Sequence, residues 1–184
     1  SQKLDIEFTE LIAGYRLRRN TNGVFFDIYL YDSLSSGAGY SANVAKEILP
    51  LLTKAKSILE SCDCDSACHK CIKHYRNQNI HGQLDRSAAS ELLNWCLDGS
   101  LAKEIPHKIQ SDYISQIQDI LKFSGVLCDI SDKDISVSKG AIVKKLVVYP
   151  AMWKVSPDDS TVYVSDSLLK YAKPYAVEEI IKNL

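Results

Sequence analysis

The amino-acid sequence predicts an α+β protein made of two units. The first hundred residues contain a strand-type apolar run, a long stretch with helical spacing and four cysteines within ten residues. The remainder contains a helix, several short strand-type runs and two closing helices. These patterns predict a helical and hairpin unit over 1–100, stapled at its cysteines. A small α/β unit with a short mixed or antiparallel sheet is expected over 101–184, packed on the first.

The first unit is expected to begin with a β-hairpin. The apolar run from Val24 to Tyr31 predicts a strand, and the Asn22-Gly23 pair before it is a turn signal. The stretch from Leu11 to Leu17 is expected to pair with this strand. A loop of small residues follows, in which Gly37 and Gly39 predict a tight turn.

Two helices are predicted next in the first unit. Apolar residues spaced three and four apart predict the first of them: Val44, Ile48, Leu51, Leu52, Ala55, Ile58 and Leu59. Pro50 lies within that pattern and predicts a kink or a break. Asp85 is the expected N-cap of the second helix, which ends at Gly99. Cys96 on that helix, like Cys128 further on, is expected to be an ordinary core residue.

The second unit begins with a predicted helix. Ile114, Ile117, Ile120 and Leu121 indicate this helix, which ends at Gly125. Short strands are predicted around 126–130, 135–138, 142–149 and 161–164. Ser165 or Asp166 is expected to cap the next helix, and Pro174 to begin the last one. The weakest junction between the units is predicted between Gly99 and Pro106.

Composition excludes several classes of protein. The chain has 184 residues, 46% hydrophobic and 24% charged, with a net charge of −1. No overall positive field therefore attracts nucleic acid or an anionic membrane, and any such contact must be local. No apolar run approaches the roughly 20 residues of a membrane span. The polar start predicts no signal peptide, and the single Met152 suggests a piece of a longer protein. Because four of the six cysteines lie within ten residues and a chain of this length needs no disulfides, a reducing, cytoplasmic setting is expected.

Four cysteines predict one zinc ion. Cys62, Cys64, Cys68 and Cys71 follow the pattern C-x-C-x3-C-x2-C. Zinc prefers four soft ligands at the corners of a tetrahedron, and each short cysteine step can direct two thiolates at one point. Four protein ligands leave no open position for water, so the predicted zinc is structural and not catalytic.

Other interpretations of the cysteines are weaker. Disulfides are rare in a reducing compartment, and the spacing fits neither common ferredoxin pattern. A redox pair formed by Cys68 and Cys71 would leave the other two cysteines unexplained. His69, His74 and His81 are possible substitute ligands, but surface or supporting roles are favoured because four cysteines already complete the coordination.

The residues around the cysteines resemble a known family. The cysteine run and Ile72 are followed by Tyr75, Asn77-Gln78, His81 and Leu84-Asp85-Arg86, and preceded by Tyr29-Leu30-Tyr31-Asp32 and Gly37-Ala38-Gly39-Tyr40. This order, from about Leu11 to Leu97, resembles the MrfA-type zinc-binding domain. That domain occurs near the C-terminus of DEAD/DEAH-like DNA helicases and of related phage-defence proteins. The resemblance implies a zinc-binding accessory domain of a superfamily-two helicase, in DNA repair or phage defence, with motor domains in cis or in trans.

The chain itself is not expected to be an enzyme. It has no G-x-x-x-x-G-K-[ST] loop and no acidic helicase box. The turn at Gly37 and Gly39 precedes a helix, where anions can bind, but it lacks the lysine and hydroxyl residue of a phosphate loop. A tight turn is the favoured interpretation, and no ATP hydrolysis is expected.

A second set of residues has two possible roles, in supporting the zinc loop or in contacting DNA. These residues are Lys73, His74, Arg76, Asn77, Gln78, His81, Asp85 and Arg86. Support is favoured for the last five because outer groups commonly orient metal ligands. Lys70, Lys73, His74 and Arg76 form a basic segment that predicts weak, sequence-independent DNA binding. Arg18 and Arg19 are expected to matter less.

Two alternatives stay open. The second unit has an element order like that of restriction-type nucleases, which need several carboxylates and a lysine at a metal ion. Asp129, Asp132 and Asp134 are the available acids, and Lys144 and Lys145 the lysines, with no acid beside them in sequence. The other alternative is a pure protein–protein scaffold.

Overall fold

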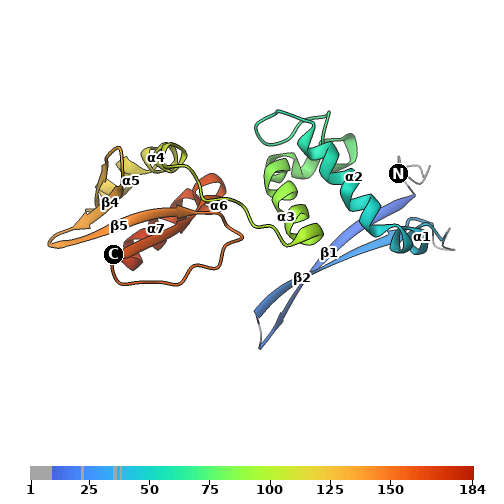
Figure 1. Cartoon of the computed structure of the whole chain (residues 1–184), viewed down its shortest axis with the longest axis horizontal. Helices are drawn as coiled ribbons and strands as arrows, with labels where there is room; N and C mark the ends of the chain where they lie inside the picture. Colours follow the sequence, from blue (N-terminus) through green and yellow to red (C-terminus); the bar gives the residue numbers. More distant parts are fainter. Residues whose placement is uncertain (1–9, 22, 35–36, 38) are drawn as a thin grey trace. The chain divides into compact units, whose positions relative to one another are not determined.

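The computed structural model describes residues 10–21, 23–34, 37 and 39–184. The predicted turn residue Asn22 and Ala38 of the glycine turn lie outside these ranges. The chain divides into two compact units, Ser1–Ser100 and Leu101–Leu184 (Figure 1). Helices, a two-stranded antiparallel sheet and a four-stranded mixed sheet confirm the predicted α+β class.

The predicted hairpin is present at the start of the first unit. Strand β1 (Leu11–Asn20) pairs antiparallel with β2 (Gly23–Asp32). In this register Gly14 lies opposite Tyr29 and Arg16 opposite Asp27. Because side chains alternate along a strand, the register divides the hairpin into two distinct faces.

The glycine turn leads from the hairpin into helix α1 (Tyr40–Lys46). Gly37 and Gly39 have φ values of 68° and 77°, which glycine adopts more readily than other residues. The Asp32 carboxylate accepts hydrogen bonds from the backbone N–H groups of Gly39 (2.9 Å) and Ser41 (2.7 Å). A carboxylate of the chain itself therefore occupies the N-terminus of α1, where the phosphate interpretation would place an anion.

The predicted break occurs three residues before Pro50. Helix α1 ends at Lys46 and α2 (Ile48–Glu60) begins after Glu47, so that Pro50 falls in the first turn of α2. A proline there removes an N–H that has no partner within the helix, which explains the shift.

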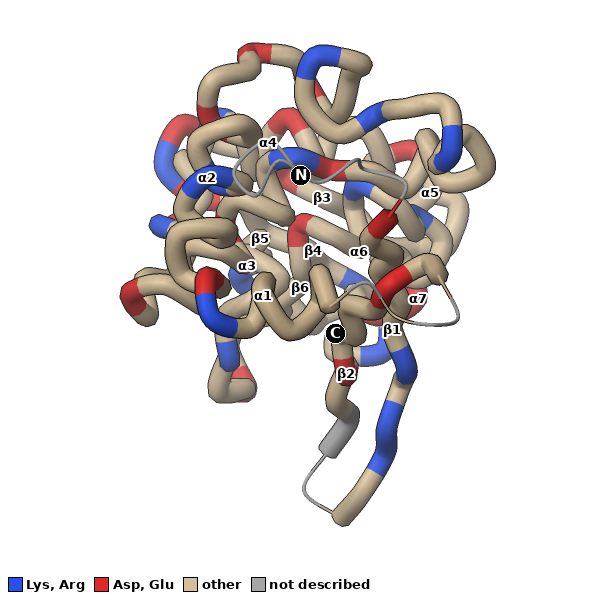
Figure 2. The backbone as a smooth tube through the Cα atoms, turned by 90° about the vertical axis from the view of Figure 1, so that its right-hand side faces the viewer, with Lys and Arg blue, Asp and Glu red and all other residues tan. Residues whose placement is uncertain are grey.

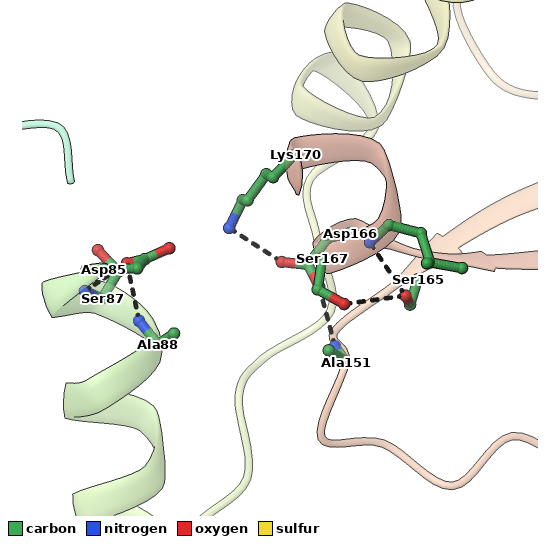
Figure 3. Close-up of polar contacts among 9 residues, drawn as sticks. Asp85, Ser87, Ala88, Ala151, Ser165, Asp166, Ser167 and Lys170 are labelled. Carbon is green, nitrogen blue, oxygen red and sulfur yellow. Dashed lines mark hydrogen bonds and ion pairs between the residues drawn. The ribbon is translucent and has the colours of Figure 1, made fainter. Parts of the chain in front are cut away.

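Helix α3 (Arg86–Asp98) packs against α2 (Figure 1). Both predicted ends of α3 are confirmed. The Asp85 side chain accepts hydrogen bonds from Ser87 N–H and Ala88 N–H at its start, as Figure 3 shows. Gly99, with φ of 77°, follows its end.

The first unit has a very small apolar core. Among its described residues, only Val44, Leu59 and Ala67 are buried hydrophobics. The prediction that Cys96 is a core residue is wrong: its thiol is exposed. The prediction failed because apolar spacing shows which face of a helix is apolar but not whether a neighbouring element covers that face.

The second unit contains the mixed sheet. Two helices, α4 (His107–Ser115) and α5 (Gln118–Phe123), replace the single predicted helix, and the buried Ile117 lies between them. The sheet has the order β3 (Leu127–Ile130), β4 (Ile135–Lys139), β5 (Ile142–Tyr149) and β6 (Thr161–Ser165). The first three strands are antiparallel neighbours, and β6 is parallel to β5.

Two helices, α6 (Asp166–Tyr171) and α7 (Lys173–Asn183), complete the second unit. The Ser165 side chain caps α6 at Leu168 N–H, and Asp166 contacts Ala151 N–H and the Lys170 ammonium (Figure 3). One cluster of fourteen buried hydrophobic residues joins these helices, α4, α5 and the sheet. The described helices include none with the length and apolar character needed to cross a bilayer.

Candidate metal centre

The four cysteines converge in the loop between α2 and a 3-10 helix, η1 (Tyr75–Gln83). Their Sγ atoms all lie within 4.8 Å of one another. The shortest separations are 3.5 Å between Cys62 and Cys68, 3.7 Å between Cys64 and Cys71, and 3.8 Å between Cys68 and Cys71. In the described part of the chain, no other group of three or more metal-ligating side chains comes together in this way.

These distances fit one zinc ion. A tetrahedron with zinc–sulfur bonds of ~2.3 Å has sulfur–sulfur edges of about 3.8 Å. All six cysteines are free, and the 3.5 Å shortest separation is far longer than a disulfide bond. The site therefore has the ligand type, number and spacing of a structural zinc centre, and zinc bound there would close the loop that follows α2.

Backbone N–H groups point at the sulfur atoms. Cys68 N lies 3.1 Å from Cys71 Sγ, and Lys70 N lies 3.4 Å from Cys68 Sγ. The backbone N–H groups of Cys71 and Lys73 both donate to the Cys68 carbonyl, which closes the turn. Such N–H groups stabilise thiolates because they place positive partial charge beside negative sulfur.

The thiols differ strongly in acidity in the absence of metal. Desolvation, reinforced by hydrogen bonds to the other cysteines, raises the pKa of Cys64 to about 12. The Lys70 backbone N–H, followed by the Cys62 thiol, lowers the pKa of Cys68 to about 7. At neutral pH the empty cluster therefore retains protons that an arriving zinc ion must displace.

Zinc affinity is accordingly expected to rise with pH. Between pH 6 and pH 8 the raised pKa of Cys64 keeps its thiol protonated, whereas Cys68 loses its proton across this window. Calorimetric titration of the metal-stripped chain in buffers of different ionisation enthalpy should show release of more than one proton per zinc ion. Zinc binding that releases no protons would show that the zinc ion is not held by these four thiols.

Arg86 connects the start of α3 to the cysteine loop. Its Nε donates to the Cys64 carbonyl at 2.7 Å and its guanidinium to the Leu59 carbonyl at 3.3 Å. Its backbone N–H also donates to the Ser66 carbonyl at 2.7 Å. One half-buried arginine thus binds the end of α2, the cysteine loop and α3 together. Its side chain also forms a hydrogen bond with the Cys64 thiol, which partly offsets the causes that raise the pKa of that thiol.

A second network surrounds Asn77 in η1. Its side-chain oxygen accepts from His74 N–H at 2.8 Å, and its amide donates to the Ile72 carbonyl at 2.8 Å. His81 Nε2 lies 2.9 Å from the same Asn77 oxygen and 3.1 Å from the His74 carbonyl. These contacts attach η1 to the end of the cysteine loop, which is the supporting role expected for Asn77 and His81.

The remaining candidates lie at the surface of this region. Gln78, His74 and Arg76 are exposed and Lys73 is half-buried. His69 is exposed and its ring packs edge-on against His81, with centroids 5.5 Å apart. Neither histidine joins the group of four sulfur ligands. Helix η1 was not predicted, because its residues show no apolar repeat.

The acids considered for a nuclease do not converge. In residues 101–184, all of which are described, Asp134 forms an ion pair with Lys145 (2.8 Å), and no three acids come together. No acid stands beside Lys144 or Lys145 in sequence, but the pairing of β4 with β5 brings Asp134, which directly precedes β4, to Lys145. Lys144 instead donates to the Asn183 carbonyl. The pair lines a cavity of about 340 Å³ with Glu104 and His107.

The family of the MrfA Zn-binding domain matches residues 12–72, which include all four cysteines. The predicted resemblance is confirmed over those residues, and the positions from Lys73 onward lie outside the match. The predicted zinc cofactor is also confirmed: a zinc-binding family matches, and four cysteines lie close enough together to hold one ion.

A curated protein is similar to this chain over the chain's whole length. The Druantia protein DruE of Escherichia coli (strain UMEA 4076-1) is 28% identical over 200 residues, covering 100% of this chain and 11% of that protein. The chain thus spans about a ninth of the length of the relative it matches. No solved structure matches the chain.

Proposed function

We propose that this chain is a non-catalytic, zinc-stapled accessory domain of a superfamily-two DNA helicase that acts in phage defence. The observation that carries the proposal is the combination of four converging thiols with a very small core: among the described residues of the first unit, only Val44, Leu59 and Ala67 are buried hydrophobics. A core of this size stabilises little, so bound zinc would supply much of the folding free energy. The similarity to the Druantia protein favours defence over DNA repair.

The motor domains are the proposed protein partner, in cis or in trans. Helices α2 and α3 expose large apolar side chains, including Leu49 (60%) and Trp95 (52%). Exposed apolar patches of this kind mark protein contact sites. A small unit with little core and much exposed apolar surface is suited to packing on a larger neighbour.

DNA guidance is the proposed contribution of the zinc loop. Lys70, Lys73, His74 and Arg76 follow one another within seven residues of a loop that zinc would hold rigid. A rigid basic segment loses little conformational entropy when it binds phosphates. A few phosphate contacts would give weak, sequence-independent binding.

Forked DNA should bind the full chain with a dissociation constant on the order of 10⁻⁵ M, measured by fluorescence anisotropy at two salt concentrations. Replacing both Lys73 and Arg76 with Ala should weaken binding to all sequences alike. The slope of affinity against salt concentration should fall by the amount expected for about two phosphate contacts. Lys103→Ala with Lys108→Ala removes the same charge from two exposed positions and should leave binding unchanged. No binding at low salt would leave the chain as a protein–protein scaffold.

A further inference from the structure

The β1–β2 hairpin has two well-separated faces. The register places Arg16, Arg18, Phe25, Tyr29 and Tyr31 on one side, here called the arginine face. The other side carries Tyr15, Leu17, Phe26, Ile28 and Leu30, here called the apolar face. Both faces are accessible: Tyr31 is 50% exposed and Ile28 is 70% exposed. A two-stranded hairpin is only marginally stable by itself in water, so the two exposed faces are candidates for binding a partner.

Cations and aromatic rings alternate on the arginine face. The Arg16 guanidinium lies 5.8 Å from the Tyr29 ring centroid, and the Arg18 guanidinium lies 5.7 Å from that of Phe25. Both arginines also contact the Asp27 carboxylate, at 3.5 and 3.4 Å. One carboxylate between two guanidiniums orients both and leaves one positive charge uncompensated.

The aromatic rings of the arginine face are partly exposed to solvent. Gly14 is the cross-strand neighbour of Tyr29 and has no side chain to cover that ring. The side chains of Arg16 and Arg18 are 68% and 54% exposed despite their contact with Asp27. Strand β1 contains three arginines and no acid, and Figure 2 shows its basic residues in succession along the hairpin.

We propose that the arginine face of the hairpin binds single-stranded nucleic acid. Proteins that bind single strands combine positive charge along the backbone with aromatic rings on which bases stack. Arg16 and Arg18 would contact phosphates, and Tyr29 and Tyr31 would stack with bases. The charge of the hairpin favours nucleic acid over another protein, because the hairpin is positive within a chain of net charge −1. The inference rests on the proposed DNA-linked function but uses a surface separate from the zinc loop.

The sequence alone ranks Arg18 and Arg19 below the zinc-loop cations. The structure changes that ranking for Arg16 and Arg18, because it places them beside exposed rings. Arg19 lies on the opposite face and is not part of the proposed surface.

The test compares hairpin variants of the full chain in binding a labelled oligothymidine at low salt. Arg16→Gln with Arg18→Gln should weaken binding about tenfold and reduce the salt slope by about 1.4, the value for two single-strand phosphate contacts. Tyr29→Ala should weaken binding at least about fivefold through lost stacking. The pair Lys103→Gln and Lys108→Gln, which removes equal charge from exposed positions, should bind as the unchanged chain does.

Photo-crosslinking to a thiothymidine-containing strand gives a readout that does not depend on variants folding, and it should label peptides containing Tyr29 or Tyr31. Binding that survives loss of both arginines, with no crosslink in β2, overturns the inference but not the proposed function. Binding lost with Ile28→Thr yet kept without the arginines would place the oligothymidine on the apolar face and overturn the inference. Absence of all DNA binding by the unchanged chain overturns the proposed DNA guidance by the zinc loop as well.

Discussion

Replacing Cys68 with Ser is expected to abolish stable zinc binding and to unfold residues 62–86. Apparent binding free energies of structural zinc are about 10–16 kcal/mol, whereas a domain of this size has a total stability of about 5–15 kcal/mol. The first unit buries only three described apolar residues and cannot replace that contribution. Hydrogen–deuterium exchange should therefore show near-complete loss of protection across the loop, η1 and the start of α3.

Two comparisons make this result specific. Cys96→Ser changes an exposed thiol on the neighbouring helix and should keep full protection. Residues 101–184 should keep theirs in both variants, because the fourteen-residue core of the second unit contains no part of the cysteine loop. Unchanged protection over 62–86 in Cys68→Ser would mean that the loop is stable without metal.

Arg86→Gln is expected to weaken zinc binding by about 10- to 100-fold, the usual effect of removing a group that orients metal ligands. The arginine donates to the carbonyls of Cys64 and Leu59, and glutamine is too short to satisfy both. Charge-assisted hydrogen bonds contribute about 1.5–3 kcal/mol, so the free energy of unfolding should fall by a similar amount. Competition with a chromophoric chelator measures the affinity.

Arg76→Gln is the matched control for Arg86→Gln, because it removes the same charge from an exposed residue of η1. It should bind zinc within a factor of about two of the unchanged chain, since loss of an exposed surface charge has little effect. Arg86→Lys should fall between the two, because lysine keeps the charge but not the planar fork of donors. Equal affinities for all three would show that Arg86 does not support the site.

The sequence was most informative where one local rule decides the structure. Cysteine spacing alone specifies a tight metal loop, and the cluster of four sulfurs follows that pattern. The apolar run that predicted β2 and the capping residues Asp85 and Gly99 that predicted the ends of α3 are likewise local signals. In the second unit, short apolar runs predicted the strands, and β4, β5 and β6 each contribute residues to one buried core.

The features that were not predicted from the sequence depend on contacts that no local sequence pattern records. Arg86 reaches back 22 residues to the Cys64 carbonyl, and no periodic pattern records such a contact. Helix η1 is held by the side-chain bonds of Asn77 and His81, which no apolar spacing reveals. The apolar spacing of Cys96 indicated burial, yet no described neighbour covers it.

Metal analysis of the natively purified full chain, combined with X-ray absorption at the zinc edge, tests the central claim most directly. Four sulfur atoms lying within 4.8 Å of one another predict one zinc ion per chain with four sulfur neighbours at ~2.3 Å. The zinc should be lost in Cys68→Ser and should stay at one ion with four sulfur neighbours in Cys96→Ser. Iron at the site, or a chain with no metal and four reactive thiols, would contradict the account.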